Sequence, residues 1–127
     1  MDLGLSGCLV GRMSFDSSVA ILIGNGCELR IESEVILKGF GGGDVHVDPE
    51  DPGDKSPLLI RLINDVVSEA SVDAFGGLLV RFSAGVAICI PPHAEFEAWG
   101  LVGPGDRRVT CMPGGELALW DGSAPRS

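Results

Sequence analysis

Residues 19–32 have the sequence VAILIGNGCELRIE, and this stretch decides the fold class. Residues 19–23 are apolar and mostly β-branched, which favours an extended strand. Residues 24–26, Gly-Asn-Gly, tolerate the positive φ angles that tight hairpin turns require. Residues 27–32 then alternate between apolar and charged side chains, the period of a half-buried strand. The stretch therefore predicts a β-hairpin with one apolar face.

A second stretch in the other half of the chain has the same pattern. Residues 78–90, LLVRFSAGVAICI, match the first stretch at a constant offset. We therefore predict an internal duplication of residues 8–40 in residues 66–101, although short alternating hairpins also match by chance. Upstream, Val10 and Asp16 correspond to Val67 and Asp73 after a small gap. The matched pairs are Val19 with Leu78, Ile21 with Val80, Ile23 with Phe82, Gly26 with Gly85, Cys27 with Val86, Leu29 with Ile88 and Ile31 with Ile90.

The remaining segments are predicted from alternating apolar patterns and from breaks rich in Gly or Pro. Residues 44–55 are acidic and interrupted by proline, so we expect a loop there. Ser56 and Pro57 suit the N-cap and the first position of a helix, and apolar residues at helical spacing follow them. Further strands are expected at residues 8–15, 34–40, 66–72, 95–101, 108–112 and 116–120.

We predict a mainly β fold of the α+β class over a single domain, residues 1–127, with a loose tail at 122–127. Two related antiparallel meanders are expected to form a sandwich or a flattened barrel, with one short helix near residues 57–64. The predicted core consists of Val19, Ile21, Ile23, Leu29, Ile31, Leu59, Leu62, Val80, Phe82, Ile88, Ile90, Trp99 and Leu119.

The chain is acidic, with a formal net charge of −9. A phosphate backbone and an anionic membrane surface would both be repelled, so we expect neither nucleic acid nor membrane as a partner. A basic protein partner would be attracted by this field, although acidity also serves solubility alone. No apolar run approaches the roughly 20 residues of a membrane span, and the N-terminus lacks a secretory pattern, so we expect a cytoplasmic protein. Its cysteines contain no CxxC pair and are expected to be reduced, buried side chains.

The acidic stretch around residues 44–54 contains the main candidates for a binding site. Asp44, His46 and Asp48 would share one face of an extended segment, and His93 and Glu95 have a similar spacing. These residues suggest a Zn or Mn site, a docking surface for a basic partner, or simply a solvated edge. A calcium loop is not expected, because prolines interrupt the ligand spacing. The predicted partner-binding residues are Asp44, His46, Asp48, Glu50, Asp51, Asp54 and Trp99.

The sequence allows two interpretations of the position of Trp99. With Phe82, Phe96 and Trp120 it could form an aromatic binding patch, because aromatic residues anchor interfaces. The same side chains could instead close one end of the core.

No catalytic motif is recognised in the chain. It lacks the Gly-x-Ser-x-Gly elbow, and the glycine run at residues 41–43 lacks the following Lys-Ser/Thr of a phosphate-binding loop. Cys8, Cys27 and Cys89 fall inside strand patterns, where a thiol is unreactive. We therefore predict a protein that is not an enzyme and that has no cofactor.

Three motifs resemble those of one family. A Phe-x-x-Gly turn between strands occurs at Phe82–Gly85, a Glu-x-Trp at Glu97–Trp99, and a Pro-Gly-Gly-Glu hairpin at Pro113–Glu116. This arrangement resembles small actinobacterial proteins that form a domain family of unknown function, and the resemblance extends from Leu5 to Trp120. It implies no activity and no catalytic residue. The layout and charge also resemble small immunity proteins that neutralise bacterial toxins.

These observations lead to three functional hypotheses. The first is a non-catalytic protein-binding module of an immunity or antitoxin type. The second is a small-molecule-binding β domain with its ligand between the two halves. The third is a metal-dependent enzyme that uses His46 and His93. A symmetric homodimer through an uncovered edge strand is compatible with each of them.

Overall fold

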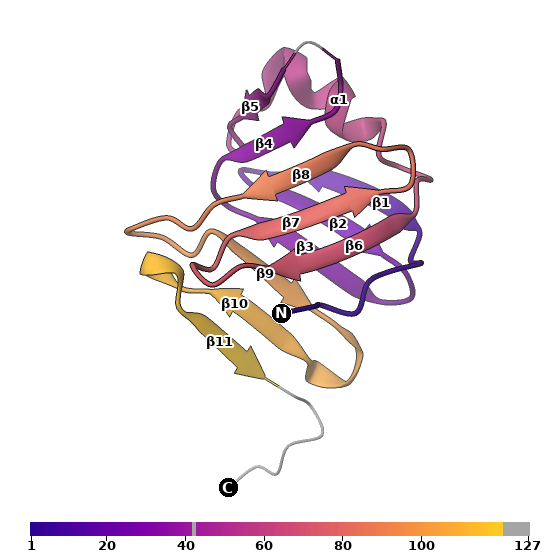
Figure 1. Ribbon diagram of the computed structural model, residues 1–127. Coiled ribbons are helices and arrows are strands. Elements are labelled where there is room, and N and C mark those ends of the chain that lie inside the picture. Colours follow the sequence, from indigo (N-terminus) through magenta and orange to yellow (C-terminus); the bar gives the residue numbers. More distant parts are fainter. Residues whose placement is uncertain (42, 121–127) are drawn as a thin grey trace, which may run out of the picture.

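The computed structural model describes residues 1–41 and 43–120, in which two antiparallel sheets pack face to face (Figure 1). One sheet has the strand order β1-β2-β3-β9-β10-β11 and the other has the order β5-β4-β8-β7-β6. The predicted mainly β sandwich is therefore confirmed, and the sheets do not close into a barrel. The predicted tail lies outside the described residues. The strands are β1 (Val10–Phe15), β2 (Val19–Ile23), β3 (Cys27–Ile31), β4 (Val35–Lys38), β5 (Val45–Val47), β6 (Val67–Val72), β7 (Leu78–Phe82), β8 (Ala87–Ile90), β9 (Trp99–Val102), β10 (Arg108–Cys111) and β11 (Leu117–Trp120).

The strands β1-β2-β3 and β6-β7-β8 form two meanders with corresponding registers. Val19 pairs with Ile31 in the first meander, and Leu78 pairs with Ile90 at the corresponding place in the second. Each meander also has an irregularity at the start of its first strand, after Val10 and after Val67 respectively. The internal duplication stays a prediction. Two copies of one ancestral meander would have corresponding strand registers, and the two meanders here do.

The chain changes sheets after the third strand of each meander. β4 pairs with β8 of the second meander, and β9 pairs with β3 of the first. The registers of these pairings also correspond, since Leu37 lies opposite Ile88 and Leu101 lies opposite Leu29. Each half of the chain therefore contributes strands to the sheet of the other half.

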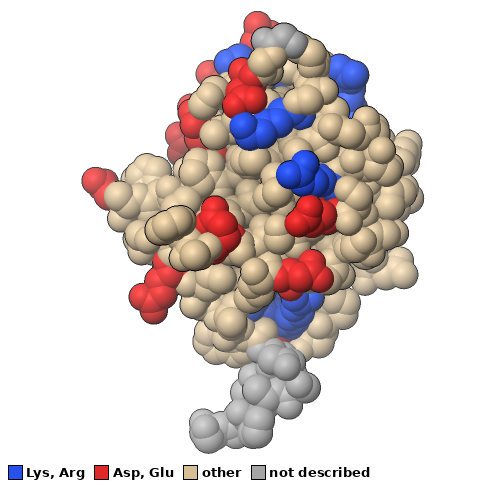
Figure 2. Space-filling model, in the orientation of Figure 1, with Lys and Arg blue, Asp and Glu red and all other residues tan. Residues whose placement is uncertain are grey.

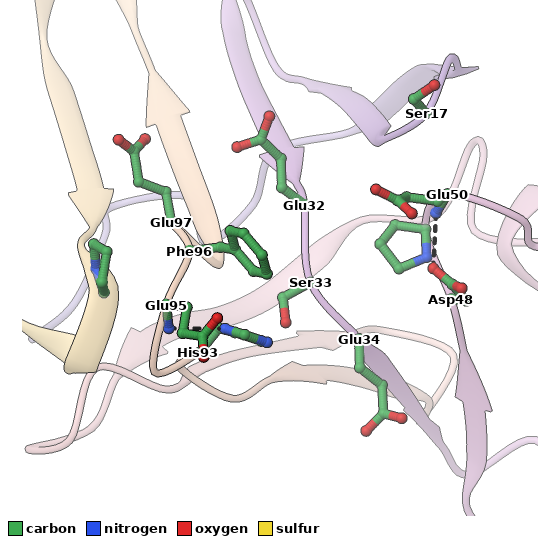
Figure 3. Close-up of a pocket in the computed structure, with 12 residues that line it drawn as sticks. Ser17, Glu32, Ser33, Glu34, Asp48, Glu50, His93, Glu95, Phe96 and Glu97 are labelled. Atoms are coloured by element: carbon green, nitrogen blue, oxygen red, sulfur yellow. Dashed lines mark hydrogen bonds between the residues drawn. The ribbon is translucent and has the colours of Figure 1, made fainter.

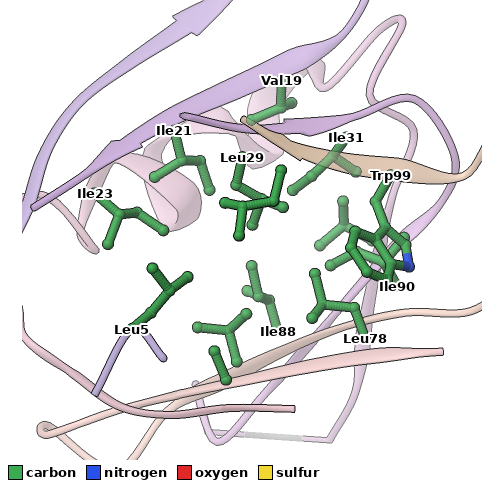
Figure 4. Close-up of a cluster of buried hydrophobic side chains, with 14 of the residues drawn as sticks. Leu5, Val19, Ile21, Ile23, Leu29, Ile31, Leu78, Ile88, Ile90 and Trp99 are labelled. Atoms are coloured by element: carbon green, nitrogen blue, oxygen red, sulfur yellow. The ribbon is translucent and has the colours of Figure 1, made fainter. Parts of the chain in front are cut away.

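The core lies between the two sheets and is drawn from both halves (Figure 4). Every predicted core residue except Leu119 is buried. Leu119 is 60% exposed because β11 is the sixth strand of its sheet and the facing sheet has only five. Sequence analysis missed Leu3 and Leu5, which are buried because the N-terminal segment hydrogen-bonds along β6.

Three predicted elements need correction. The helix is shorter than expected, since α1 spans Ser56–Ile60 after a 3-10 turn η1 (Gly53–Lys55), and its N-cap is Lys55 without a side-chain hydrogen bond. Residues 44–55 are not entirely a loop, because they include β5. The strand predicted at 95–101 begins only at Trp99, because residues 94–96 form an exposed bend and residues 97 and 98 belong to no strand. In the part of the chain that the structure describes, no helix has the length and apolar character of a membrane span.

The Pro-Gly-Gly turn between β10 and β11 packs directly on the turn between β6 and β7. Trp99 is 1% exposed, and its indole N–H donates to the Gly76 carbonyl oxygen at 3.0 Å. This hydrogen bond fixes the β6–β7 turn to the core. A Cβ atom on Gly115 would collide with the Phe75 carbonyl oxygen, whereas one on Gly114 would meet nothing within 4 Å. Both Gly114 and Gly115 have positive φ.

This contact predicts different stabilities for two neighbouring variants. Gly114→Ala should lower the free energy of unfolding by about 1 kcal/mol, because alanine is strained at positive φ. Gly115→Ala should lower it by about 3 kcal/mol, because overpacking adds to the same strain. Urea denaturation of both variants measures the difference, and equal losses would contradict the close contact between the two turns.

Candidate functional site

A groove of about 830 Å³ lies where the chain changes sheets. In Figure 3 the segment between β3 and β4 runs through the middle of the lining, with the segment between β8 and β9 on one side and the residues after β5 on the other. The two segments touch, since Glu32 N–H donates to Ala98 O at 2.9 Å. Pro49 and Pro113, which follow β5 and β10, complete the lining together with Ser17 and the residues on either side of Pro49. Both halves of the chain therefore form the groove.

The groove is strongly acidic. Among the described residues, those that line it include no Lys or Arg, and their six carboxylates belong to Glu32, Glu34, Asp48, Glu50, Glu95 and Glu97. Figure 2 shows acidic side chains along the left edge, where the loop between β8 and β9 projects. The arrangement concentrates negative potential in a concave surface, which attracts cations.

These carboxylates are mostly unpaired, in contrast to acidic residues on the sheet faces. Among the described residues, Glu34 is the only groove carboxylate within 4.0 Å of a basic side chain, with His46 Nδ1 at 3.0 Å from its Oε1. Away from the groove, Glu28, Asp44 and Glu69 each lie within 4.0 Å of a Lys or Arg. The groove therefore keeps its charge available for a ligand.

An aromatic side chain lies among the carboxylates. Phe96 is 59% exposed, and its ring contacts that of His93 with centroids 4.6 Å apart. The His93 Nδ1 atom accepts a hydrogen bond from Glu95 N–H at 3.0 Å, which holds the imidazole against its own loop (Figure 3). An exposed ring beside carboxylates offers a cation both charge and a π face.

The structure brings together some of the predicted partner-binding residues and separates others. Asp48 and Glu50 line the groove, and His46 adjoins it through Glu34. Asp44 instead pairs with Lys38 at 2.8 Å. Asp51 and Asp54 are exposed but do not line the groove, and the buried Trp99 belongs to the core.

Sequence analysis did not assign Glu32, Glu34 and Glu97 to a binding site, and it named Glu95 as a possible metal ligand. Glu32 and Glu34, and likewise Glu95 and Glu97, look like solvated strand faces when each pair is considered alone. The predicted repeat offers a signal, because the first pair begins directly after Ile31 and the second begins five residues after the matched Ile90.

The described residues contain no group of three or more His, Cys, Asp or Glu side chains placed to hold a metal ion. Asp44 and His46 are each engaged by a neighbour, and His93 hydrogen-bonds within its own loop. The carboxylates of the groove, together with Phe96, suit recognition of cationic groups.

The cysteines differ in burial more than expected. Cys111 is buried and its Sγ donates to Gly76 O at 3.3 Å, whereas Cys8, Cys27 and Cys89 are only half-buried. Burial raises the pKa of the Cys89 and Cys111 thiols, so a smaller fraction of each is the reactive thiolate at neutral pH.

Comparison with known proteins gives a family without an assigned role. The model of a family of unknown function, DUF6188, matches residues 1–121. The chain belongs to this family. No curated protein and no solved structure matches the chain. Membership of DUF6188 therefore supports the expectation of an uncharacterised domain family and carries no activity or ligand.

Thiol reactivity in this DUF6188 chain should follow burial. Alkylation of the native protein with iodoacetamide should modify Cys111 at least tenfold more slowly than Cys8, because Cys111 is inaccessible and its pKa is raised. Mass spectrometry of the digested protein measures each rate, with urea-unfolded protein as the control. Equal rates for Cys8 and Cys111 in the native protein would contradict the burial of Cys111.

Proposed function

We propose that this protein is a non-catalytic protein-binding module whose acidic groove receives a basic segment of a partner. The main support for the proposal is the lining of the groove, in which the described chain places six carboxylates and neither Lys nor Arg. Electrostatic complementarity of this kind raises association rates and selects partners by charge. The groove is open and extends over loops from both halves, which suits a chain segment as its occupant.

The chemistry of the groove favours Arg or Lys side chains as the recognised groups. Guanidinium and ammonium groups pair with carboxylates, and they also stack on aromatic faces such as that of Phe96. An immunity-type role, in which the module neutralises a basic toxin in the cytoplasm, is the specific form of this proposal. The actinobacterial distribution of the family and its three shared motifs likewise stay predictions.

Charge-neutralising variants test the role of the groove. The double variant Glu32→Gln/Glu97→Gln removes two groove charges, and Glu28→Gln/Glu69→Gln removes two charges that are paired elsewhere. Affinity capture from a lysate of the source organism should retain a basic protein on the wild type and on the second variant. Calorimetry with that protein should show binding weakened by roughly tenfold in the groove variant, at about 0.5–1 kcal/mol per exposed carboxylate.

Two results would contradict this proposal. One is capture that retains no basic protein. The other is a basic protein bound equally well by both double variants, which would show attraction by net charge alone.

A small-molecule ligand is the second candidate, favoured by a separate hollow of about 370 Å³. This hollow is lined mainly by apolar side chains, and strands from both halves contribute, including Ile36 from β4 and Leu79 from β7. Its volume lies within the range of pockets for small ligands, roughly 300–1,000 Å³. A thermal-shift screen of metabolites would support this candidate if Leu79→Lys abolished a shift that the wild type shows.

A further inference from the structure

Three of the four edge strands in the sandwich are protected against pairing with another strand. The edge of β6 is covered by the N-terminal segment, in which Leu3 N–H donates to Ala70 O at 2.8 Å. β5 is only three residues long, and the Lys55 ammonium donates to His46 O beside it at 2.8 Å. β1 is interrupted by a bulge near its start. Short strands, covering segments and bulges are the usual means by which proteins block edge-to-edge association.

The fourth edge strand, β11, is also short at four residues, but within the described chain it has neither a bulge nor a segment that covers its outer edge. Its sequence is Leu-Ala-Leu-Trp without Lys, Pro or a bulge, and no strand of the described chain pairs with its outer edge. Met112 N–H donates to Glu116 O at 2.7 Å at the base of the β10–β11 turn. Because hydrogen-bonded pairs alternate along an antiparallel ladder, the backbone groups of Leu117 and Leu119 point to the free edge.

The side chains of β11 are also apolar on both faces of the sheet. Leu119 is 60% exposed on the inner face, where the five-stranded sheet does not reach it. Trp120 is 56% exposed on the opposite face. An edge that offers both backbone groups and apolar side chains is suited to another extended strand.

Charge distinguishes this edge from the rest of the molecule and indicates what occupies it. The chain has a net charge of −9, which opposes contact between two copies over most surfaces. Residues 99–120 instead contain two acidic residues, Asp106 and Glu116, and two basic residues, Arg107 and Arg108. The stretch of chain that forms β9, β10 and β11 therefore carries no net charge of its own, so two copies meet there with less repulsion than over the acidic faces.

We infer that two copies of the chain associate through antiparallel pairing of their β11 strands. This pairing joins two six-stranded sheets into one continuous sheet across a twofold axis, and the same backbone groups of each copy serve as donors and acceptors. Leu119 and Trp120 of each copy become covered. Pro113, which lines the acidic groove, lies at the turn end of β11, so the two grooves face opposite ends of the dimer.

Sedimentation velocity of the full chain tests this inference. The wild type should show a concentration-dependent species of twice the 13.2 kDa chain mass. Leu119→Pro removes an N–H that points to the free edge, and Leu119→Lys places a charge there; each should weaken dimerisation at least tenfold. Val102→Lys is the matched control, because Val102 is exposed on β9, an interior strand of the same sheet, and this variant should dimerise as the wild type does.

Hydrogen exchange provides a second measurement that does not depend on a variant. The amides of residues 117–120 should become protected as the wild-type concentration rises, while amides in β9 stay unchanged. A wild type that is monomeric at all concentrations would overturn the inference. So would a dimer that forms without added protection at residues 117–120, or one that both Leu119 variants leave intact while folded by circular dichroism.

Discussion

After β3 and again after β8, the chain leaves its own meander and pairs with the third strand of the other one. Both sheets and the core between them form only through this exchange of strands. Each sheet is completed only by strands from the other half, so neither half can bury its apolar face alone. The mixed pairing also explains why buried residues from both halves form a single cluster.

The same exchange creates the acidic groove. The two segments that pass between the sheets must run across the end of the sandwich, and Glu32 and Ala98 hydrogen-bond to each other there. Carboxylates on both segments consequently lie close together, although they are far apart in the sequence. Concentrating like charges opposes the compact state, so the unpaired carboxylates of this groove do not serve stability, and the proposed cationic ligand would offset their repulsion.

The hairpins could be predicted from sequence because their signals are local. Alternating side chains and a glycine in each turn define β2-β3 and β7-β8. Of the eleven strands in the described chain, the same kind of pattern predicted all except β5, at least in part. Pairing between β3 and β9 depends on contacts between distant residues, which no local pattern records. Local alternation was misleading at residues 95–98, which form no strand: residues 95 and 96 lie in an exposed bend, and Ala98 is buried. Leu119 has the pattern of a core residue and is exposed only because the facing sheet ends before it.

The exchange of strands between the meanders can be tested most directly by backbone nuclear Overhauser effects in solution. The structure predicts cross-strand effects between β3 and β9, including Leu29 with Leu101, and between β4 and β8, including Leu37 with Ile88. Effects that instead pair β3 with β4, and β8 with β9, as simple hairpins would contradict the exchange and remove the basis for a shared core and groove.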